Sequence, residues 1–409
     1  MNFGAKCMDI SFENTETAFK YKSDRELRLA KFLFKTMNIP WLVSLGTKLT
    51  PFIIKSGLPV KNIIRKTIFK QFVGGETLEE TSKVVDTVSN YNVEVILDYG
   101  AEGKDGEENF EKATSQFIKV INYAATQPHI PYISVKLTAF SRFTLLEKLN
   151  EVLTEREVLH GLINTDTLTQ SEKEEWKKVV DRMQRICRAA AASNTSVMID
   201  AEESWLQAPV DALTIAMMEV YNLEKPVVYN TIQLYRIDRL AFLKASAAAA
   251  KDRYLPAFKI VRGAYMEKER ARAEEHNYPS PIQPDKAHTD RDYNSAIDFC
   301  LRHIHQLAVV IASHNEESNL YATELINELS IAMDHEHVHF SQLYGMSDNI
   351  TFNLAKAGCS VSKYLPFGPI KDVIPYLMRR AQENSSVKGQ TGRQLSLINK
   401  ELERRKKSN

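Results

Sequence analysis

Cysteine is scarce in this sequence, and long apolar runs are absent. Four cysteines occur in 409 residues and none stands in a C-x-x-C pair: they are Cys7, Cys187, Cys300 and Cys359. This spacing indicates neither a disulfide scaffold nor a zinc site, and it is typical of a reducing, intracellular compartment. No stretch approaches the roughly 18 consecutive apolar residues that a membrane span needs.

Targeting signals and a surplus of charge are absent too. Residues 1–20 have neither the apolar run of a signal peptide nor the Arg-rich, acid-poor composition of a transit sequence, so we expect a cytoplasmic protein. The net charge of +1 gives no reason to expect nucleic acid as a partner. The glycines Gly100, Gly103 and Gly106 have the wrong spacing for G-x-G-x-x-G, which disfavours a Rossmann dinucleotide site.

Charge is unevenly spread near the N-terminus. Residues Arg28 to Gly75 contain nine Lys or Arg and no Asp or Glu, interleaved with apolar residues such as Phe32 and Trp41. This composition suits peripheral attachment to the inner face of an anionic membrane. The alternative is a helical arm whose apolar face packs on the main domain while the lysines face water. The sequence leaves both readings open.

Beyond this arm, short β-branched apolar runs alternate with longer helical patterns, for example at Glu108–Gln127, Arg236–Lys251 and Glu316–Leu329. The runs are apolar on both faces, as buried parallel strands are. Eight such strands with helical crossovers predict an α/β fold, a (β/α)8 TIM-type barrel. The expected strands are Val93–Asp98, Tyr132–Leu137, Ser196–Asp200, Val227–Gln233, Ala257–Arg262, Ala308–Ser313, His337–Leu343 and Val361–Leu365.

The same pattern predicts the division of the chain. We expect an N-terminal helical arm over 1–84, a catalytic barrel over 85–395 and a polar tail over 396–409. The charged, helical stretch at about 140–194, between the second and third strands, is interpreted as an insertion.

Polar residues follow most of the expected strands, at the end where barrel enzymes carry their active sites. Farther on, Tyr376, Arg379 and Arg380 share one face of an expected helix, with Glu383 one turn beyond. Two adjacent guanidiniums form a fork that suits a small carboxylate. The polar residues at the strand ends are Lys136, Asp200, Gln233, Lys259, Arg262, Tyr265, Ser313, His314 and Tyr364.

Two other readings of single motifs are weaker. The alternate histidines of His335-Glu336-His337-Val338-His339 share one face of a strand, as metal ligands would, but no further ligand motif stands out, and we predict no metal. Lys136 is also placed like the Schiff-base lysine of a barrel aldolase. That reading accounts for Lys136 and leaves the arginine fork unexplained.

Taken together, these motifs resemble the proline dehydrogenases, flavoenzymes that oxidise L-proline to 1-pyrroline-5-carboxylate. The resemblance covers about residues 70 to 390, in family order, and is closer to the monofunctional, eukaryote-like branch than to the bifunctional bacterial enzymes. The motifs that carry it are Phe72-Val73-Gly74-Gly75-Glu76, Ile96-Leu97-Asp98-Tyr99-Gly100, Val135-Lys136-Leu137-Thr138, Ile199-Asp200-Ala201-Glu202, Lys259-Ile260-Val261-Arg262-Gly263-Ala264-Tyr265, Ala312-Ser313-His314-Asn315 and Tyr364 through Asn384.

The resemblance implies a role for each matching residue. Arg379 and Arg380 would bind the proline carboxylate, with Lys136 as a further cation. Asp200 would orient substrate and flavin. The side chains that wall the substrate ring would be Tyr265, Leu343, Tyr364 and Tyr376. The residues that line FAD would be Asp200, Ala201, Gln233, Lys259, Arg262, Gly263, Ala264, Ser313, His314 and Glu383. Some bacterial members exchange Arg and Lys at positions 259 and 262, so which of these two cations touches the flavin ring stays open.

The family also implies cofactor and partners. FAD would take the hydride, Asp200, Lys259 and Arg262 would act in catalysis, and a quinone would accept the electrons. The sequence has no second domain with a nucleophilic cysteine, so the product would pass to a separate pyrroline-5-carboxylate dehydrogenase. Three alternatives remain: a hydroxyproline dehydrogenase of the same family, a Schiff-base aldolase, and a membrane-attached barrel that binds a metabolite without turnover.

Overall fold

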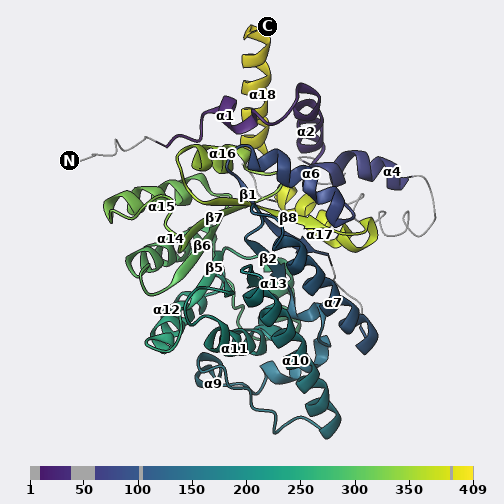
Figure 1. Cartoon of the computed structure of the whole chain (residues 1–409), viewed down its shortest axis with the longest axis vertical. Coiled ribbons are helices and arrows are strands. Elements are labelled where there is room, and N and C mark those ends of the chain that lie inside the picture. Colours follow the sequence, from purple (N-terminus) through teal and green to yellow (C-terminus); the bar gives the residue numbers. More distant parts are fainter. Residues whose placement is uncertain (1–9, 38–59, 101–104, 387–389, 409) are drawn as a thin grey trace. The chain divides into compact units, whose positions relative to one another are not determined.

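The structure, a computed structural model of the whole chain, describes residues 10–37, 60–100, 105–386 and 390–408 (Figure 1). Within these ranges, the side chains of residues 60–61, 382–386 and 390 are not described. The chain divides into two compact units. Unit 1 comprises Met1–Gly100 with Gln342–Asn409, and unit 2 comprises Ala101–Ser341.

Eight strands form a closed barrel in the order β1 to β8, which confirms the predicted (β/α)8 fold. Every predicted strand is present, and the ends differ by no more than two residues. The strands are β1 Glu94–Tyr99, β2 Tyr132–Val135, β3 Ser196–Ile199, β4 Val228–Gln233, β5 Ala257–Val261, β6 Ala308–Ala312, β7 Val338–Leu343 and β8 Val361–Phe367. The strands β2, β3, β5 and β6 end one or two residues earlier than predicted, whereas β1 and β8 extend one and two residues further.

Helices alternate with these strands, as the sequence pattern predicts. Those of unit 2 are α7 Glu107–Ala124, the 3-10 turn η2 Leu137–Ala139, α8 Phe143–Asn150, α9 Glu155–Leu159, α10 Gln170–Ala192, α11 Ser204–Tyr221, α12 Arg239–Ala250, α13 Met266–Glu275, α14 Lys286–Arg302 and α15 Glu316–Glu328. Those described in unit 1 are α1 Thr15–Phe19, α2 Asp24–Met37, α4 Val60–Ile64, the π-helix η1 Arg65–Phe69, α5 Lys70–Phe72, α6 Leu78–Ser89, α16 Asp348–Lys356, α17 Ile370–Ser386 and α18 Gln390–Ser408.

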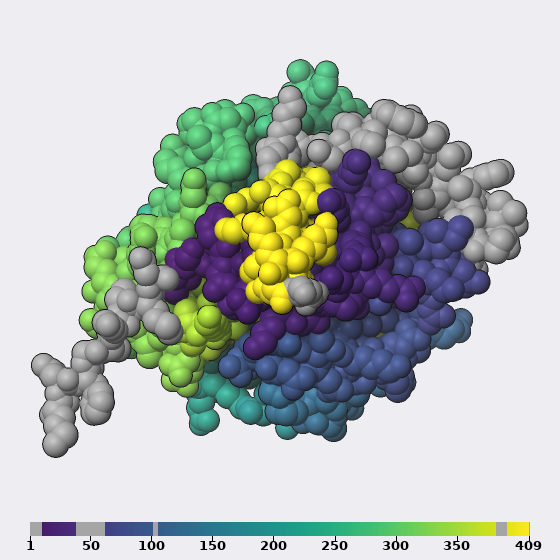
Figure 2. Space-filling view, turned by 90° about the horizontal axis from the view of Figure 1, so that it is seen from above, coloured from purple at the N-terminus to yellow at the C-terminus, as the bar shows by residue number. Residues whose placement is uncertain are grey.

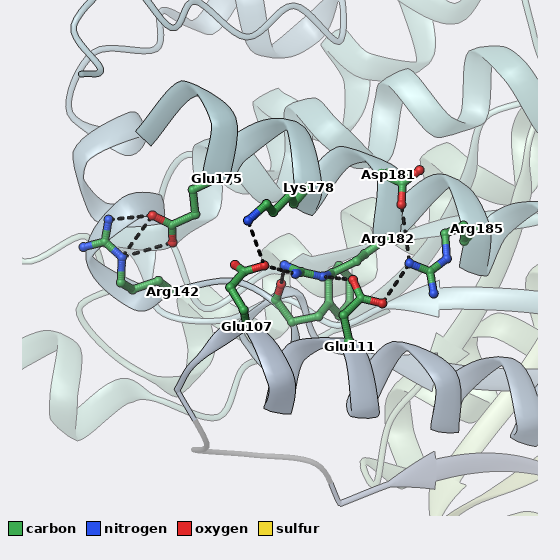
Figure 3. Close-up of polar contacts among 9 residues, drawn as sticks. Glu107, Glu111, Arg142, Glu175, Lys178, Asp181, Arg182 and Arg185 are labelled. Carbon is green, nitrogen blue, oxygen red and sulfur yellow. Dashed lines mark hydrogen bonds and ion pairs between the residues drawn. The ribbon is translucent and has the colours of Figure 1, made fainter. Parts of the chain in front are cut away.

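The stretch between β2 and β3 contains α8, α9 and α10. Thr154 and Thr169 are the N-cap residues of α9 and α10. Each forms a reciprocal capping box that satisfies backbone N–H groups at the helix start. Ion pairs then join α10 to α7 (Figure 3). The Arg182 guanidinium, 1% exposed, lies 2.6 Å from a Glu107 oxygen and 2.8 Å from a Glu111 oxygen. This clamp, made of Arg182, Glu107 and Glu111, holds α10 against α7.

In unit 1 the N-terminal helices pack against the C-terminal helix. Leu27 and Phe34 of α2 share a buried apolar cluster with Leu397 and Ile398 of α18. Figure 2 shows the purple N-terminal segments on both sides of α18, drawn in yellow. Residues 396–408, predicted as a polar tail, are therefore helical and partly buried. Trp41, expected to enter a membrane interface, lies outside the described residues. Among the residues that the structure does describe, no helix is long and apolar enough to cross a bilayer.

A buried ion cluster holds the N-terminal segment to α16 and β8 within unit 1. Asp348 accepts a hydrogen bond from the Tyr21 hydroxyl at 2.8 Å, and its oxygens lie 2.9 Å from both Lys22 Nζ and Lys363 Nζ. Burial alone would raise the pKa of Asp348, but the two ammonium groups outweigh burial and lower it to about 2. Lys363 is 0% exposed, so its charge depends on this carboxylate.

We predict that Asp348→Asn destabilises the fold by about 3–5 kcal/mol, because it leaves the buried Lys363 ammonium uncompensated. The measurement is urea unfolding at pH 7. The lowered pKa means that Asp348 contributes stability above its ordinary pKa of 3.8 and loses it as the pH falls toward about 2. The gap between wild type and variant should therefore shrink over that range.

Asp86→Asn, on the exposed face of α6, is the matched control and should unfold like the wild type. An Asp348→Asn variant with the same urea midpoint as that control would show that the cluster is not needed for stability.

Candidate active site

A buried carboxylate between two lysines lies in unit 2, where Lys136 and Asp200 directly follow β2 and β3 and Lys259 lies within β5. Asp200 Oδ2 accepts from Lys136 Nζ at 2.6 Å, and Oδ1 accepts from Lys259 Nζ and from Ser134 Oγ, the latter at 2.5 Å. Burial would raise the pKa of Asp200, but the ammoniums of Lys136 and Lys259 outweigh it and hold the pKa well below its usual range. The carboxylate is therefore ionised at all ordinary pH values.

Strand register brings these residues together. Val135 pairs with Ile199, and the Asp200 N–H donates to the Val135 carbonyl at 2.9 Å, which places Asp200 beside Lys136. Sequence reasoning predicted both lysines and Asp200 and missed Ser134. A signal was present, because Ser134 and Lys136 are two residues apart on a strand and so share a face.

A second carboxylate, Glu202, lies next to this group. It accepts hydrogen bonds from the Thr138 N–H at 3.2 Å and from Thr138 Oγ1 at 2.5 Å. Gln233, a predicted cofactor residue, donates its side-chain N–H to the Glu202 carbonyl at 2.7 Å. Burial raises the pKa of Glu202 to about 7, and the bonds from Thr138 and the nearby Lys136 oppose that rise. Glu202 was part of a motif in the sequence, but it had no predicted role.

Arg262 takes up a different position from Lys259. Its Nε lies 2.8 Å from an Asp290 oxygen, its Nη1 donates to Ser313 Oγ at 2.7 Å, and its Nη2 donates to Ser318 Oγ at 2.9 Å. Its guanidinium also stacks 4.3 Å from the centre of the Tyr293 ring. Ser318 belongs to the first turn of α15, so a cation and a helix N-terminus meet here, a favourable setting for an anion. Asp290 and Ser318 had no signal in the sequence that marked them as partners of Arg262.

The remaining predicted cofactor residues of unit 2 follow strand ends as expected. Gly263 has φ +136°, and a Cβ there would meet the Tyr235 ring at 2.3 Å, so this position requires glycine. Tyr265 stands at the N-cap of α13. The others are Ala201 after β3, Ala264 after β5 and His314 after β6.

The predicted substrate residues of unit 1 lie on β7, β8 and α17. Leu343 ends β7, and Tyr364, in β8, accepts a main-chain bond from Tyr344. On α17, Tyr376 and Arg380 are 8% and 7% exposed, and the Arg380 guanidinium lies 5.2 Å from the centre of the Tyr376 ring. The half-buried Arg379 is the adjacent residue on α17. The side chain of Glu383 is outside the described residues.

The histidines of the His335–His339 segment pack with other side chains. The rings of His335 and His337 lie 5.4 Å apart, and His337 Nδ1 is 2.9 Å from the Ile304 carbonyl. His339 is buried against the Tyr132 ring at 5.0 Å, and burial lowers its pKa to about 3. Within the part of the chain that the structure describes, no three His, Cys, Asp or Glu side chains are grouped as metal ligands.

Comparison with known proteins gives consistent results. A model of the family described as proline dehydrogenase matches residues 81–393. Proline dehydrogenase 1, mitochondrial, of Dictyostelium discoideum is 30% identical over 426 residues, which cover 96% of this chain and 74% of that protein. Hydroxyproline dehydrogenase of Xenopus laevis is 31% identical over 415 residues, covering 95% of this chain and 88% of the relative.

A solved structure supports the fold. Proline utilization A (PutA) from Bdellovibrio bacteriovorus superposes with a TM-score of 0.68 at 20% identity, and the match covers 92% of this chain. The chain spans only 38% of that larger protein. At this identity the likeness concerns the barrel fold alone.

Proposed function

The chain belongs to the proline dehydrogenase family and is an oxidoreductase of proline catabolism; on this premise, we propose that it oxidises L-proline to 1-pyrroline-5-carboxylate with non-covalently bound FAD. The observation that carries the proposal is the group of Lys136, Asp200 and Lys259, which lies within and directly after barrel strands in a chain that matches the family over residues 81–393. A carboxylate that stays charged beside two cations suits a site that must orient a zwitterionic amino acid.

The donor set around Arg262 suits the diphosphate of FAD. Arg262 and Ser313 lie at the N-terminus of α15, where guanidinium, hydroxyl and helix dipole all favour an anion. Because Asp290, Ser313 and Ser318 hold Arg262 in this place, we assign Lys259, next to Asp200, as the cation near the flavin ring. The other residues proposed to line the cofactor are Asp200, Ala201, Gln233, Gly263, Ala264, His314 and Glu383.

When bound, FAD supplies the acceptor for the hydride that leaves the carbon next to the proline nitrogen. The chain supplies geometry and charge. We propose that Arg379, Arg380 and Lys136 bind the proline carboxylate. This binding would fix the position of the reacting carbon in the site. Arg380 supports this role because it is a largely buried cation on the same helix face as Tyr376. The proposed wall of the substrate ring is Tyr265, Leu343, Tyr364 and Tyr376.

Of two alternative activities, the structure disfavours a Schiff-base aldolase, and a relative favours the oxidation of 4-hydroxyproline. A Schiff-base lysine reacts as a neutral amine, whereas the ion pair of Lys136 with Asp200 at 2.6 Å stabilises the charged ammonium, so the aldolase is disfavoured. Oxidation of 4-hydroxyproline is the second candidate, because one relative of similar identity is named hydroxyproline dehydrogenase. Both substrates belong in the same assay.

We also propose that the electrons pass to a quinone in a membrane, and that a separate pyrroline-5-carboxylate dehydrogenase consumes the product. One exposed face of α2 supports peripheral attachment of a cytoplasmic protein to the inner face of that membrane. Arg28, Lys31 and Lys35 are exposed there together with Phe32, which is 59% exposed. Such a face combines lipid-attracted cations with an apolar residue that can enter the interface.

We predict that the purified protein has the visible absorption of an oxidised flavin, that acid denaturation releases free FAD, and that anaerobic L-proline bleaches the absorption. Release is expected because the implied contacts are polar side chains without a covalent tether. Absorption spectra before and after each addition are the measurement, with L-alanine as the control amino acid. Flavin that stays with the precipitated chain would refute non-covalent binding, and a spectrum unchanged by proline or 4-hydroxyproline would refute the oxidation.

A second prediction concerns the carboxylate. Arg380→Met should lower kcat/KM for proline about 30- to 1000-fold, mainly through KM, because a charge-assisted pair in a closed site contributes roughly 2–4 kcal/mol. Steady-state kinetics measure the effect, and the flavin spectrum should not change. Arg188→Met, at an exposed position of α10, is the control. A change of less than about threefold in Arg380→Met would mean that the carboxylate is held elsewhere.

A third prediction concerns the membrane. Wild-type protein should co-sediment with anionic vesicles at low salt and be released at high salt, because exposed charges are screened. Replacing Arg28, Lys31 and Lys35 together by Gln should weaken binding by up to about a hundredfold, since each cation contributes at most about 1 kcal/mol.

The control replaces three exposed basic residues of unit 2, Lys177, Arg188 and Lys251, by Gln and should bind like the wild type. If the wild-type protein does not bind anionic vesicles, or if the two triple variants bind equally well, α2 is a packed arm and not a membrane contact.

A further inference from the structure

The turn that follows Lys136 is held by side chains from two different directions. Lys136 leaves β2 and leads directly into η2, the 3-10 turn Leu137–Ala139. A short turn of this kind has few hydrogen bonds of its own. The position of the Lys136 ammonium beside Asp200 therefore depends on what fixes the turn.

Glu202 fixes the turn from the side of β3. Its two carboxylate oxygens accept separately from the two donors of Thr138: Oε1 from the N–H at 3.2 Å and Oε2 from Oγ1 at 2.5 Å. The backbone of Glu202 is anchored as well. Its N–H donates to Gln207 Oε1 at 2.9 Å, and its carbonyl accepts from Gln233 at 2.7 Å. Glu202 thus connects the end of β2 with the end of β4.

Arg182 fixes the far end of the same turn. Its Nη1 donates to the Phe140 carbonyl at 3.2 Å, and Phe140 is the C-cap of η2. Figure 3 shows Arg182 held between Glu107 and Glu111 in the clamp that joins α7 and α10. The clamp therefore reaches η2 only beyond its last residue, and Glu202 is the contact nearer to Lys136.

Resting on the proposed function, we propose that Glu202 and Thr138 form a positioning pair that holds Lys136 in place for the substrate carboxylate. Glu202 is 5% exposed. Burying a carboxyl group is unfavourable unless hydrogen bonds compensate the loss of water. A carboxyl group has two oxygens and accepts from both Thr138 donors at once, which the single side-chain oxygen of a glutamine could not do in the same arrangement. Neither residue needs to touch substrate or cofactor.

The pair predicts a specific kinetic signature. Lys136 would contact the carboxylate in the ground state and in the transition state alike, so misplacing it should raise KM and change kcat little. Thr138→Val keeps the shape of the side chain and removes only the hydroxyl donor. We expect it to raise KM for proline about tenfold, the effect of losing one buried hydrogen bond, with kcat within about threefold of wild type.

Matched variants separate this role from general damage. Thr138→Ser restores the hydroxyl and should return KM to within about threefold of wild type. Glu202→Gln should also raise KM, and the double variant with Thr138→Val should be no worse than the more damaging single variant, because both remove the same contact. Thr214→Val removes a buried hydroxyl that donates to the Val210 carbonyl within α11 and should leave both constants unchanged.

Each outcome decides the proposal. Unchanged KM in Thr138→Val and Glu202→Gln, in a wild type that reduces its flavin with proline, would overturn the positioning role and leave the proposed function standing. Equal losses of flavin content, kcat and thermal midpoint without a change in KM would assign Glu202 to stability and also overturn it. A wild type that proline does not reduce would overturn the proposed function and this inference together.

Discussion

The buried negative charge of Asp200 is the constraint on which the rest of the site in unit 2 depends. A carboxylate removed from water must be compensated by cations and hydrogen bonds, or it would take up a proton. Lys136 and Lys259 supply the cations, and Ser134 supplies a donor. These partners come from β2 and β5, on either side of β3 and β4, so compensation of one charge also fixes the relative heights of several strand ends.

Lys259, within β5, and Arg262, directly after it, have separate surroundings. Lys259 belongs to the group around Asp200, whereas Asp290, Ser313 and Ser318 hold Arg262 at the start of α15. Two cations three positions apart in the sequence therefore lie in different surroundings, one beside Asp200 and the other beside the start of α15. Buried charge is compensated in the same way in unit 1, where the Asp348 carboxylate pairs with the fully buried Lys363 ammonium.

The motifs predict which residues face the site, and the structure adds the residues that support them. Ser134, Glu202 and Asp290 had no predicted role, yet each contacts a predicted residue or its neighbouring turn. Such supporting residues decide how well the contacting side chains are oriented. They are hard to find from sequence because serine, glutamate and aspartate occur at many solvated positions, and only a partner distinguishes the buried cases.

The sequence by itself determined the eight strands, the barrel and the family, because buried parallel strands leave continuous apolar runs and the motifs at their ends are specific. It also determined that Tyr376 and Arg380 share a helix face, since that follows from helical periodicity alone. Only the tertiary structure decided that Asp200 pairs with both lysines, that Glu202 holds Thr138, and that residues 396–408 form a helix with a buried face. These contacts join residues far apart in the chain, and periodicity reports only on local neighbours. Their pairing depends on strand register and on which surfaces meet, and both are set when the chain packs.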